Sequence, residues 1–119
     1  MPTVLLVDDS PLARHTVARR LRAEGFDVRA EDTVAAARTV DLSTIACAAI
    51  DVDLPDGSGL DLAAEIAARH PSLPVAFFTA STDDLDLAAA NGPVFRKPDT
   101  DALVAWVRGT ASGQPPPTK

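Results

Sequence analysis

The chain has 119 residues, a length that suits one domain with a single hydrophobic core. Apolar residues make up 46% of it and aromatic residues only 4%, so the core is expected to consist mainly of Ala, Val, Leu and Ile. The formal net charge of −6, from 17 acidic and 11 basic residues, argues against direct binding to nucleic acid.

Cysteine content and hydropathy give the expected compartment. The single cysteine, Cys47, lies in an apolar run at residues 45–50 and is expected to be a small buried side chain rather than half of a disulfide. The sequence shows neither a signal-peptide pattern nor an apolar run close to the roughly 20 residues that span a bilayer. We therefore expect a cytoplasmic protein that does not insert into a membrane.

Short apolar runs alternate with Ala-rich amphipathic segments along the whole chain. This alternation is typical of an α/β domain in which helices cover both faces of a parallel sheet. Strands are expected at residues 4–7, 28–30, 46–50, 74–78 and 94–96. Helices are expected at residues 11–24, 33–40, 60–70, 83–91 and 99–110.

Local signals set several of these boundaries. Ser10 is expected to cap the first helix, with Pro11 in its first turn and Gly25 as its stop. On that helix the apolar face is Ala13, Val17 and Leu21, and the residues expected largely on the solvent side are Arg14, Arg19, Arg20 and Arg22. Residues 112–119 are Pro-rich and have no apolar face, so we expect a domain at 1–111 and a flexible tail at 112–119.

Polar side chains follow four of the expected strands. Asp8, Asp9, Asp51, Thr79 and Lys97 all fall at the carboxyl ends of strands, the edge at which open parallel sheets bind ligands. If the first and third strands are neighbours, three carboxylates converge, which is unfavourable unless a cation neutralises them. Oxygen ligands suit Mg²⁺. Asp51 is the best placed phosphoryl acceptor, while Lys97 and Thr79 suit the oxygens of a transferring phosphoryl group.

Four motifs carry a family resemblance. In order along the chain, Asp8-Asp9, the segment 51–59, Thr79-Ala80-Ser81 and Lys97-Pro98 resemble the signatures of response regulator receiver domains, and the resemblance covers roughly residues 3–110. It implies a flavodoxin-like, doubly wound (βα)5 domain with a parallel sheet of strand order 2-1-3-4-5. It also implies a phosphorylation switch of two-component signalling, with Mg²⁺-dependent transfer to Asp51 from a sensor histidine kinase or phosphotransfer protein.

The resemblance assigns a role to each site residue. It implies that Asp9 and Asp51 ligate the metal directly, Asp53 through its backbone carbonyl, and Asp8 mainly through water. Lys97 would pair with Asp51 or its phosphate, and Thr79 would swing to bond the phosphate. The Lys97-Pro98 peptide is expected to be cis. Such a domain is a signalling module rather than an enzyme, has only intrinsic self-phosphorylation and self-dephosphorylation chemistry, and acts on a downstream protein or an attached effector.

The sequence departs from the family pattern in three places. Val94 occupies a position where many receivers have Tyr or Phe, and Phe95 beside it is expected to face the other side of the strand. The stretch from Thr79 to Lys97 is short, so an abbreviated fourth helix and a reshaped output surface are expected. Asp53 adds a carboxylate near the acceptor, which we expect to alter the rate of dephosphorylation.

Two other functions fit parts of the sequence. The Asp51-Val52-Asp53 motif after an apolar strand resembles the nucleophile motif of haloacid-dehalogenase-type phosphatases, but in this chain the acidic pair comes first. A pseudo-receiver would keep the fold and bind partners without taking phosphate. The intact Asp51, Thr79 and Lys97 argue against that second alternative.

Overall fold

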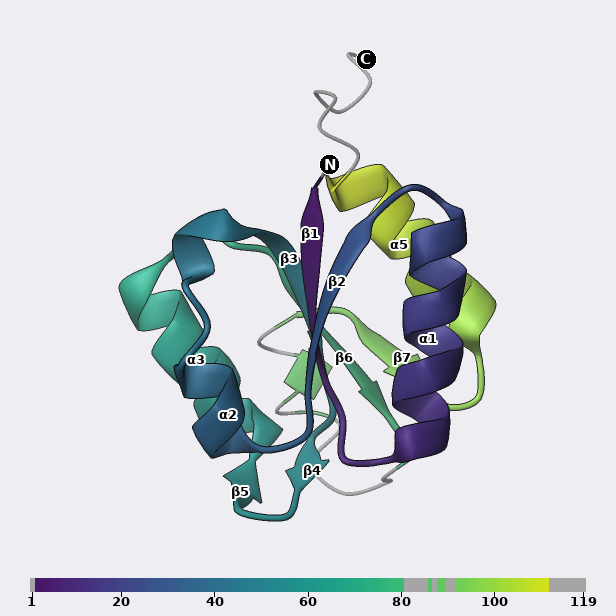
Figure 1. Cartoon of the computed structure of the whole chain (residues 1–119). Coiled ribbons are helices and arrows are strands. Elements are labelled where there is room, and N and C mark those ends of the chain that lie inside the picture. Colours follow the sequence, from purple (N-terminus) through teal and green to yellow (C-terminus); the bar gives the residue numbers. More distant parts are fainter. Residues whose placement is uncertain (1, 81–85, 87, 90–91, 112–119) are drawn as a thin grey trace.

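A computed structural model describes residues 2–80, 86, 88–89 and 92–111, and in these residues a five-stranded parallel sheet forms the centre of the molecule (Figure 1). The strands are β1 (Thr3–Val7), β2 (Asp27–Glu31), β3 (Ile45–Ile50), β6 (Val75–Thr79) and β7 (Val94–Arg96). Their spatial order is β2-β1-β3-β6-β7. The expected 2-1-3-4-5 order is confirmed, because β6 and β7 are the fourth and fifth strands of this sheet.

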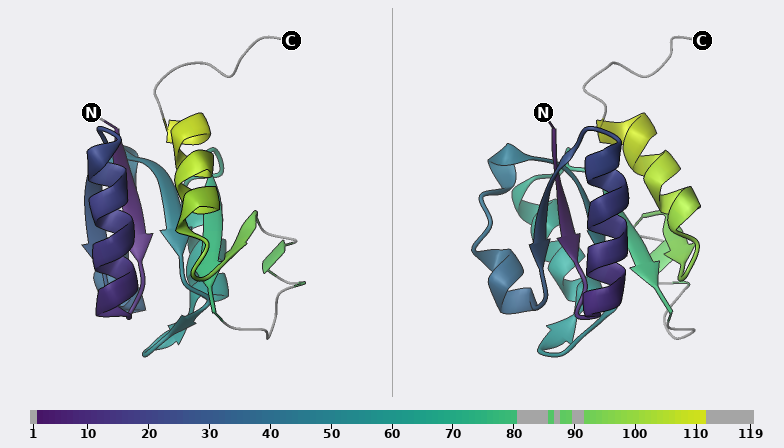
Figure 2. Two further views of the ribbon diagram at one scale, coloured as in Figure 1. Left: turned by 90° about the vertical axis from the view of Figure 1, so that its right-hand side faces the viewer. Right: turned by 45° about the vertical axis from the view of Figure 1, so that its right-hand side comes forward.

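Helices cover both faces of the sheet. Helices α2 (Val34–Arg38) and α3 (Gly59–Arg69) lie on one side, and α1 (Pro11–Ala23) and α5 (Thr100–Ala111) lie on the other (Figure 1). Figure 2 views the molecule from the side of α1 and α5. Two ion pairs connect these helices: Arg20 pairs with Asp101, and Arg108 pairs with Glu24.

The central strand β1 is buried on both faces because it is apolar throughout its last four residues. Leu5 and Val7 enter the core beneath α2 and α3, while Val4 and Leu6 enter the core beneath α1 and α5. The edge strand β2 has no fully buried residue, as expected from its weaker pattern. A sheet buried in this way leaves only its strand ends open for polar chemistry.

The first helix follows the sequence signals closely. Ser10 is its N-cap and its hydroxyl accepts a hydrogen bond from the Ala13 amide at 3.2 Å. Gly25 follows the helix with a φ of 96°, a left-handed conformation that glycine adopts without strain. The last helix also agrees with prediction. Its Leu103 and Val107 are buried, and Trp106 packs with a ring-centroid distance of 6.3 Å against Phe95.

Several predicted boundaries are corrected. The second helix was expected over residues 33–40 but spans only Val34–Arg38, because Thr39 is its C-cap and a short 3-10 helix, Leu42–Thr44, follows. The loop after Asp51 contains an unpredicted hairpin of β4 (Asp53–Leu54) and β5 (Gly57–Ser58). The fourth helix expected at 83–91 lies largely outside the described residues, as does the tail expected at 112–119.

Two further expectations are confirmed. The Lys97-Pro98 peptide is cis. Val94 packs against the core on the α2–α3 side and Phe95 against the core on the α1–α5 side, so the two neighbours face opposite sides of β7. Within the described part of the chain, each helix is too short or too polar to cross a membrane.

Cys47 is fully buried in the core beneath α1 and α5, and burial raises the pKa of its thiol to about 12. At pH 8 about one thiol in ten thousand is then ionised, and the thiolate is the reactive form. We expect the native protein to react with an aromatic disulfide reagent only as fast as it unfolds, and to release one equivalent at once in guanidinium. Rapid stoichiometric labelling without denaturant would contradict this burial.

Candidate functional site

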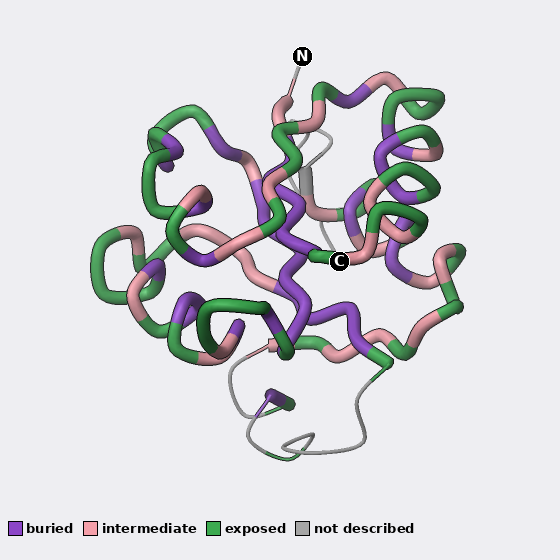
Figure 3. Tube along the Cα trace, turned by 60° about the horizontal axis from the view of Figure 1, so that its bottom comes forward, coloured by how far each residue is buried: buried purple, intermediate pink, exposed green. Residues whose placement is uncertain are grey.

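The strand ends place four of the expected residues at one edge of the sheet, which faces the viewer in Figure 3. Asp8 follows β1, Asp51 follows β3, Thr79 ends β6 and Lys97 follows β7. Backbone hydrogen bonds continue the sheet through these positions, from Asp8 N to Glu31 O, from Asp51 N to Val7 O and from Lys97 N to Thr79 O, at 2.8 to 3.0 Å. The ladder therefore fixes the main chain beneath each functional side chain.

Three carboxylates converge at this edge. Asp8, Asp9 and Asp51 each offer an oxygen atom, and these oxygens lie within 4.8 Å of one another. Asp8 and Asp51 are buried, whereas Asp9 is exposed at the rim. Like charges held this close in a poorly solvated site repel one another, so positive charge beside the cluster is favourable.

Lys97 supplies positive charge to two of the carboxylates. Its Nζ lies 2.9 Å from Asp8 Oδ2 and 3.0 Å from Asp51 Oδ2. Burial alone would lower the pKa of the Lys97 ammonium, but the close contacts with the negatively charged Asp8 and Asp51 together outweigh burial and raise it. The Phe78 ring lies beneath the ammonium, with its centroid 5.8 Å from Nζ. Lys97 therefore stays charged at neutral pH and is held from three directions.

Asp8 remains incompletely satisfied despite this ion pair. Its Oδ1 accepts a hydrogen bond from the Ser10 amide at 2.9 Å. Its Oδ2 is buried and has no hydrogen bond of good geometry, with only the charge of Lys97 close by. Burial is the largest influence on this carboxyl group and raises its pKa. A buried carboxylate oxygen with a free lone pair, next to two further carboxylates, suits a hard divalent cation such as Mg²⁺.

The other two site residues are placed differently. The Asp53 side chain is exposed and is not part of the carboxylate cluster, while its backbone amide donates to Asp51 Oδ1 at 3.2 Å. This arrangement is compatible with the expectation that Asp53 contributes its backbone carbonyl rather than its side chain. Thr79 is fully buried at the end of β6, the strand that pairs with β3.

The sequence did not indicate two of the contacts around the site. Arg14 was expected largely on the solvent side of α1, but it is half-buried and its Nη1 donates to the Asp8 carbonyl at 2.8 Å. Phe78 was predicted only as a strand residue, although it lies under Lys97. The contact between Arg14 and Asp8 has one signal in the sequence: an arginine near the second turn of the helix that begins just after the acidic pair.

The family of the chain follows from comparison with known proteins. The sequence model of the response regulator receiver domain matches residues 4–93. The chain belongs to the response regulator receiver domain family. The match decides against the phosphatase alternative.

Relatives of this receiver domain are regulators and sensors. It is 38% identical over 82 residues to the probable transcriptional regulatory protein TcrX of Mycobacterium tuberculosis. The matched region covers 66% of this chain and 34% of TcrX. It is 34% identical over 95 residues to the sensor protein TorS of Escherichia coli, covering 78% of the chain and 10% of TorS. The chain thus spans about a third or less of these relatives.

Solved structures agree with this fold. The non-phosphorylated HemR receiver domain of Leptospira biflexa has a TM-score of 0.82 and 25% identity, and the match covers 99% of this chain and 100% of that one. The response regulator TrrA of Thermotoga maritima, solved with Mg²⁺ and BeF, has a TM-score of 0.81 and 24% identity. That match covers 91% of this chain and 97% of the TrrA chain.

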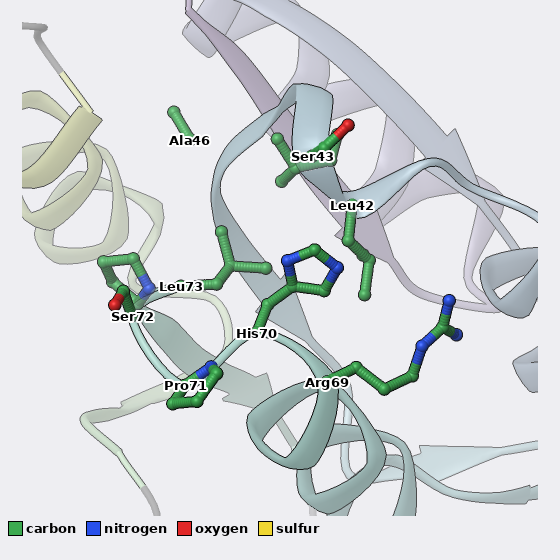
Figure 4. A pocket seen from close by; sticks show the side chains of 10 residues that line it. Leu42, Ser43, Ala46, Arg69, His70, Pro71, Ser72 and Leu73 are labelled. Atoms are coloured by element: carbon green, nitrogen blue, oxygen red, sulfur yellow. The ribbon is translucent and has the colours of Figure 1, made fainter.

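Two hollows in the described part of the receiver lie outside the carboxylate cluster. One hollow of about 360 Å³ lies at the opposite end of the sheet, where Leu42, Arg69, His70 and Leu73 are among the side chains that line it (Figure 4). Another, of about 240 Å³, borders Lys97 and Pro98 and the exposed Leu12 of α1. The second hollow adjoins the site, whereas the first is remote from all the expected site residues.

Proposed function

We propose that this receiver is a phosphorylation switch in which Asp51 accepts a phosphoryl group with Mg²⁺ bound beside it. The observation that carries the proposal is the convergence of Asp8, Asp9 and Asp51 with Lys97 at the carboxyl edge of the sheet. Receiver domains of two-component systems are such switches, and this chain keeps the polar residues that the chemistry needs.

Each residue has a distinct part in the proposed transfer. A carboxylate oxygen of Asp51 forms a bond to phosphorus while the bond from phosphorus to the donor nitrogen or oxygen breaks. Lys97 pairs with the phosphoryl oxygens, and the Thr79 hydroxyl donates a hydrogen bond to one of them. Mg²⁺, held by Asp9, Asp51 and the Asp53 carbonyl, and by Asp8 through water, would neutralise charge on those oxygens.

The proposed partners follow from the family. The donor is a sensor histidine kinase or a phosphotransfer protein, and the output is a downstream protein or an attached effector, all in the cytoplasm. Helix α1 carries four arginines and no acidic residue, and its exposed Leu12 borders the hollow beside Lys97. Apart from self-phosphorylation and self-dephosphorylation the domain is not an enzyme, and its net charge of −6 argues against direct binding to nucleic acid.

Intact-protein mass after incubation with acetyl phosphate tests the proposal. We expect the wild type to gain one phosphoryl group in the presence of Mg²⁺ and none without it. Asp51→Asn removes the nucleophilic oxygen and is expected to gain none. Asp27→Asn is the matched control, because it changes an exposed carboxylate at the opposite end of the sheet and should leave one group incorporated. A folded wild type that gains nothing would point instead to a pseudo-receiver.

A further inference from the structure

The loop that carries Asp53 is tied to helix α2 by a side chain outside the carboxylate cluster. The two Asp56 carboxylate oxygens accept hydrogen bonds from the backbone amides of Val34 at 2.8 Å and Ala35 at 3.0 Å. These partners lie 22 and 21 residues earlier in the chain. Asp56 therefore joins two segments that the sequence separates by a whole strand.

Asp56 completes the cap of α2. The Thr33 hydroxyl accepts the hydrogen bond from the Ala36 amide at 3.0 Å, so Asp56 and Thr33 together satisfy the first three amides of the helix. The bonds from Val34 and then Ala35 lower the pKa of the Asp56 carboxyl, because both stabilise its charged form. A negative charge here also lies at the favourable end of the helix dipole.

The hairpin that carries Asp56 needs such an anchor. Strands β4 and β5 have two residues each, and Asp53 pairs with Ser58 while Leu54 pairs with Gly57. A hairpin of this size is not stable by itself in water. Leu54 reaches the core beneath α2 and α3, and Asp56 in the adjoining turn ties the hairpin to the start of α2.

We propose that Asp56 is a positioning residue for the divalent cation, because its bonds to the amides of Val34 and Ala35 hold the β4–β5 hairpin and thereby place the Asp53 backbone beside the carboxylate cluster. The proposal rests on the proposed function, in which the Asp53 carbonyl is a ligand. Asp56 itself lies outside the carboxylate cluster and is not proposed as a ligand of the metal. It acts through the geometry of the hairpin, as residues behind metal ligands commonly do.

Calorimetric titration of the apo protein with Mg²⁺ alone is the main test. Asp56→Ala is expected to weaken Mg²⁺ binding by about tenfold. Asp56→Asn removes the same charge but keeps one acceptor oxygen. A smaller loss of Mg²⁺ affinity in Asp56→Asn than in Asp56→Ala would therefore separate positioning from simple electrostatic attraction. Asp41→Ala is the matched control, because Asp41 is also an exposed capping carboxylate, bonded to the Ser43 amide at 3.1 Å and to the Ser43 hydroxyl at 2.7 Å.

Hydrogen exchange without Mg²⁺ gives a second readout. In Asp56→Ala, and less so in Asp56→Asn, the amides of Val34 and Ala35 and of the hairpin are expected to exchange faster than in the wild type. Wild-type Mg²⁺ affinity in a folded Asp56→Ala variant, or equal losses for Ala and Asn, would overturn the positioning role alone. A wild type that binds no Mg²⁺ would overturn the proposed function as well, so the two failures are distinguishable.

Discussion

Replacement of Gly59 by alanine is expected to destabilise the receiver by about 3 kcal/mol. A Cβ atom at this position would lie 1.9 Å from the Asp51 carbonyl oxygen and 2.9 Å from Ile50 Cγ2. The nearest atom belongs to the backbone, so no side-chain rotation relieves the contact. Either the start of α3 or the end of β3 must move, and the amide of Gly59 would also lose its 2.7 Å hydrogen bond to Val52 O.

Guanidinium unfolding followed by circular dichroism measures this loss, and Gly109→Ala is the control. Gly109 lies in α5, where an added Cβ atom would meet no neighbouring atom of the described residues within 4 Å. Alanine there is therefore expected to stabilise the protein by about 0.5 kcal/mol through helix propensity. Because the clash involves the backbone of the proposed acceptor, Gly59→Ala is also expected to lose phosphorylation by acetyl phosphate. Equal stability of Gly59→Ala and wild type would show that the close approach is not rigid.

The sheet and the site edge could be predicted because both depend on strong local patterns. The short apolar runs at residues 4–7 and 46–50, each followed by Asp, favour central strands, and both are central strands in the structure. Once these strands are parallel neighbours, Asp8 and Asp51 must meet at one edge. The resemblance added the strand order and the cis Lys97-Pro98 peptide, which periodicity alone does not provide.

The β4–β5 hairpin and its anchor could not be predicted in the same way. Two-residue strands show no alternation, and the Pro55-Asp56 turn has the pattern of an ordinary loop. The bonds from Asp56 to Val34 and Ala35 connect segments whose contact exists only after the sheet forms. For the same reason the sequence does not indicate that Phe78 lies beneath Lys97.

Replacement of Lys97 by methionine is expected to destabilise the receiver by about 2 kcal/mol when no divalent cation is present. Methionine replaces the aliphatic part of the side chain and is one atom shorter, but it leaves the carboxylates of Asp8 and Asp51 without their ion-pair partner. Breaking a fully buried ion pair lowers the free energy of unfolding by more than this amount. The smaller value reflects the 16% exposure of the Lys97 side chain and the open rim at Asp9.

Arg38→Met is the matched control for the loss of a cation. Arg38 forms a hydrogen-bonded ion pair with Glu65 between α2 and α3, but both side chains are exposed, at 54% and 42%. Its removal is expected to change the unfolding midpoint little. A loss as large as that of Lys97→Met would show that the destabilisation does not come from the carboxylate cluster.

Mg²⁺ and a second substitution distinguish repulsion between the carboxylates from a general packing defect. If repulsion causes the loss, Asp51→Asn in the Lys97→Met background should restore part of the stability, because one of the two unpaired charges is removed. Mg²⁺ should likewise stabilise Lys97→Met more than wild type, since no ammonium competes for the carboxylate oxygens. Lys97→Met is nevertheless expected to incorporate phosphate about 100-fold more slowly, because a bound cation does not replace the charge that pairs with the phosphoryl oxygens. Stability that neither Asp51→Asn nor Mg²⁺ restores would assign Lys97 a packing role and contradict the charge balance inferred for the site.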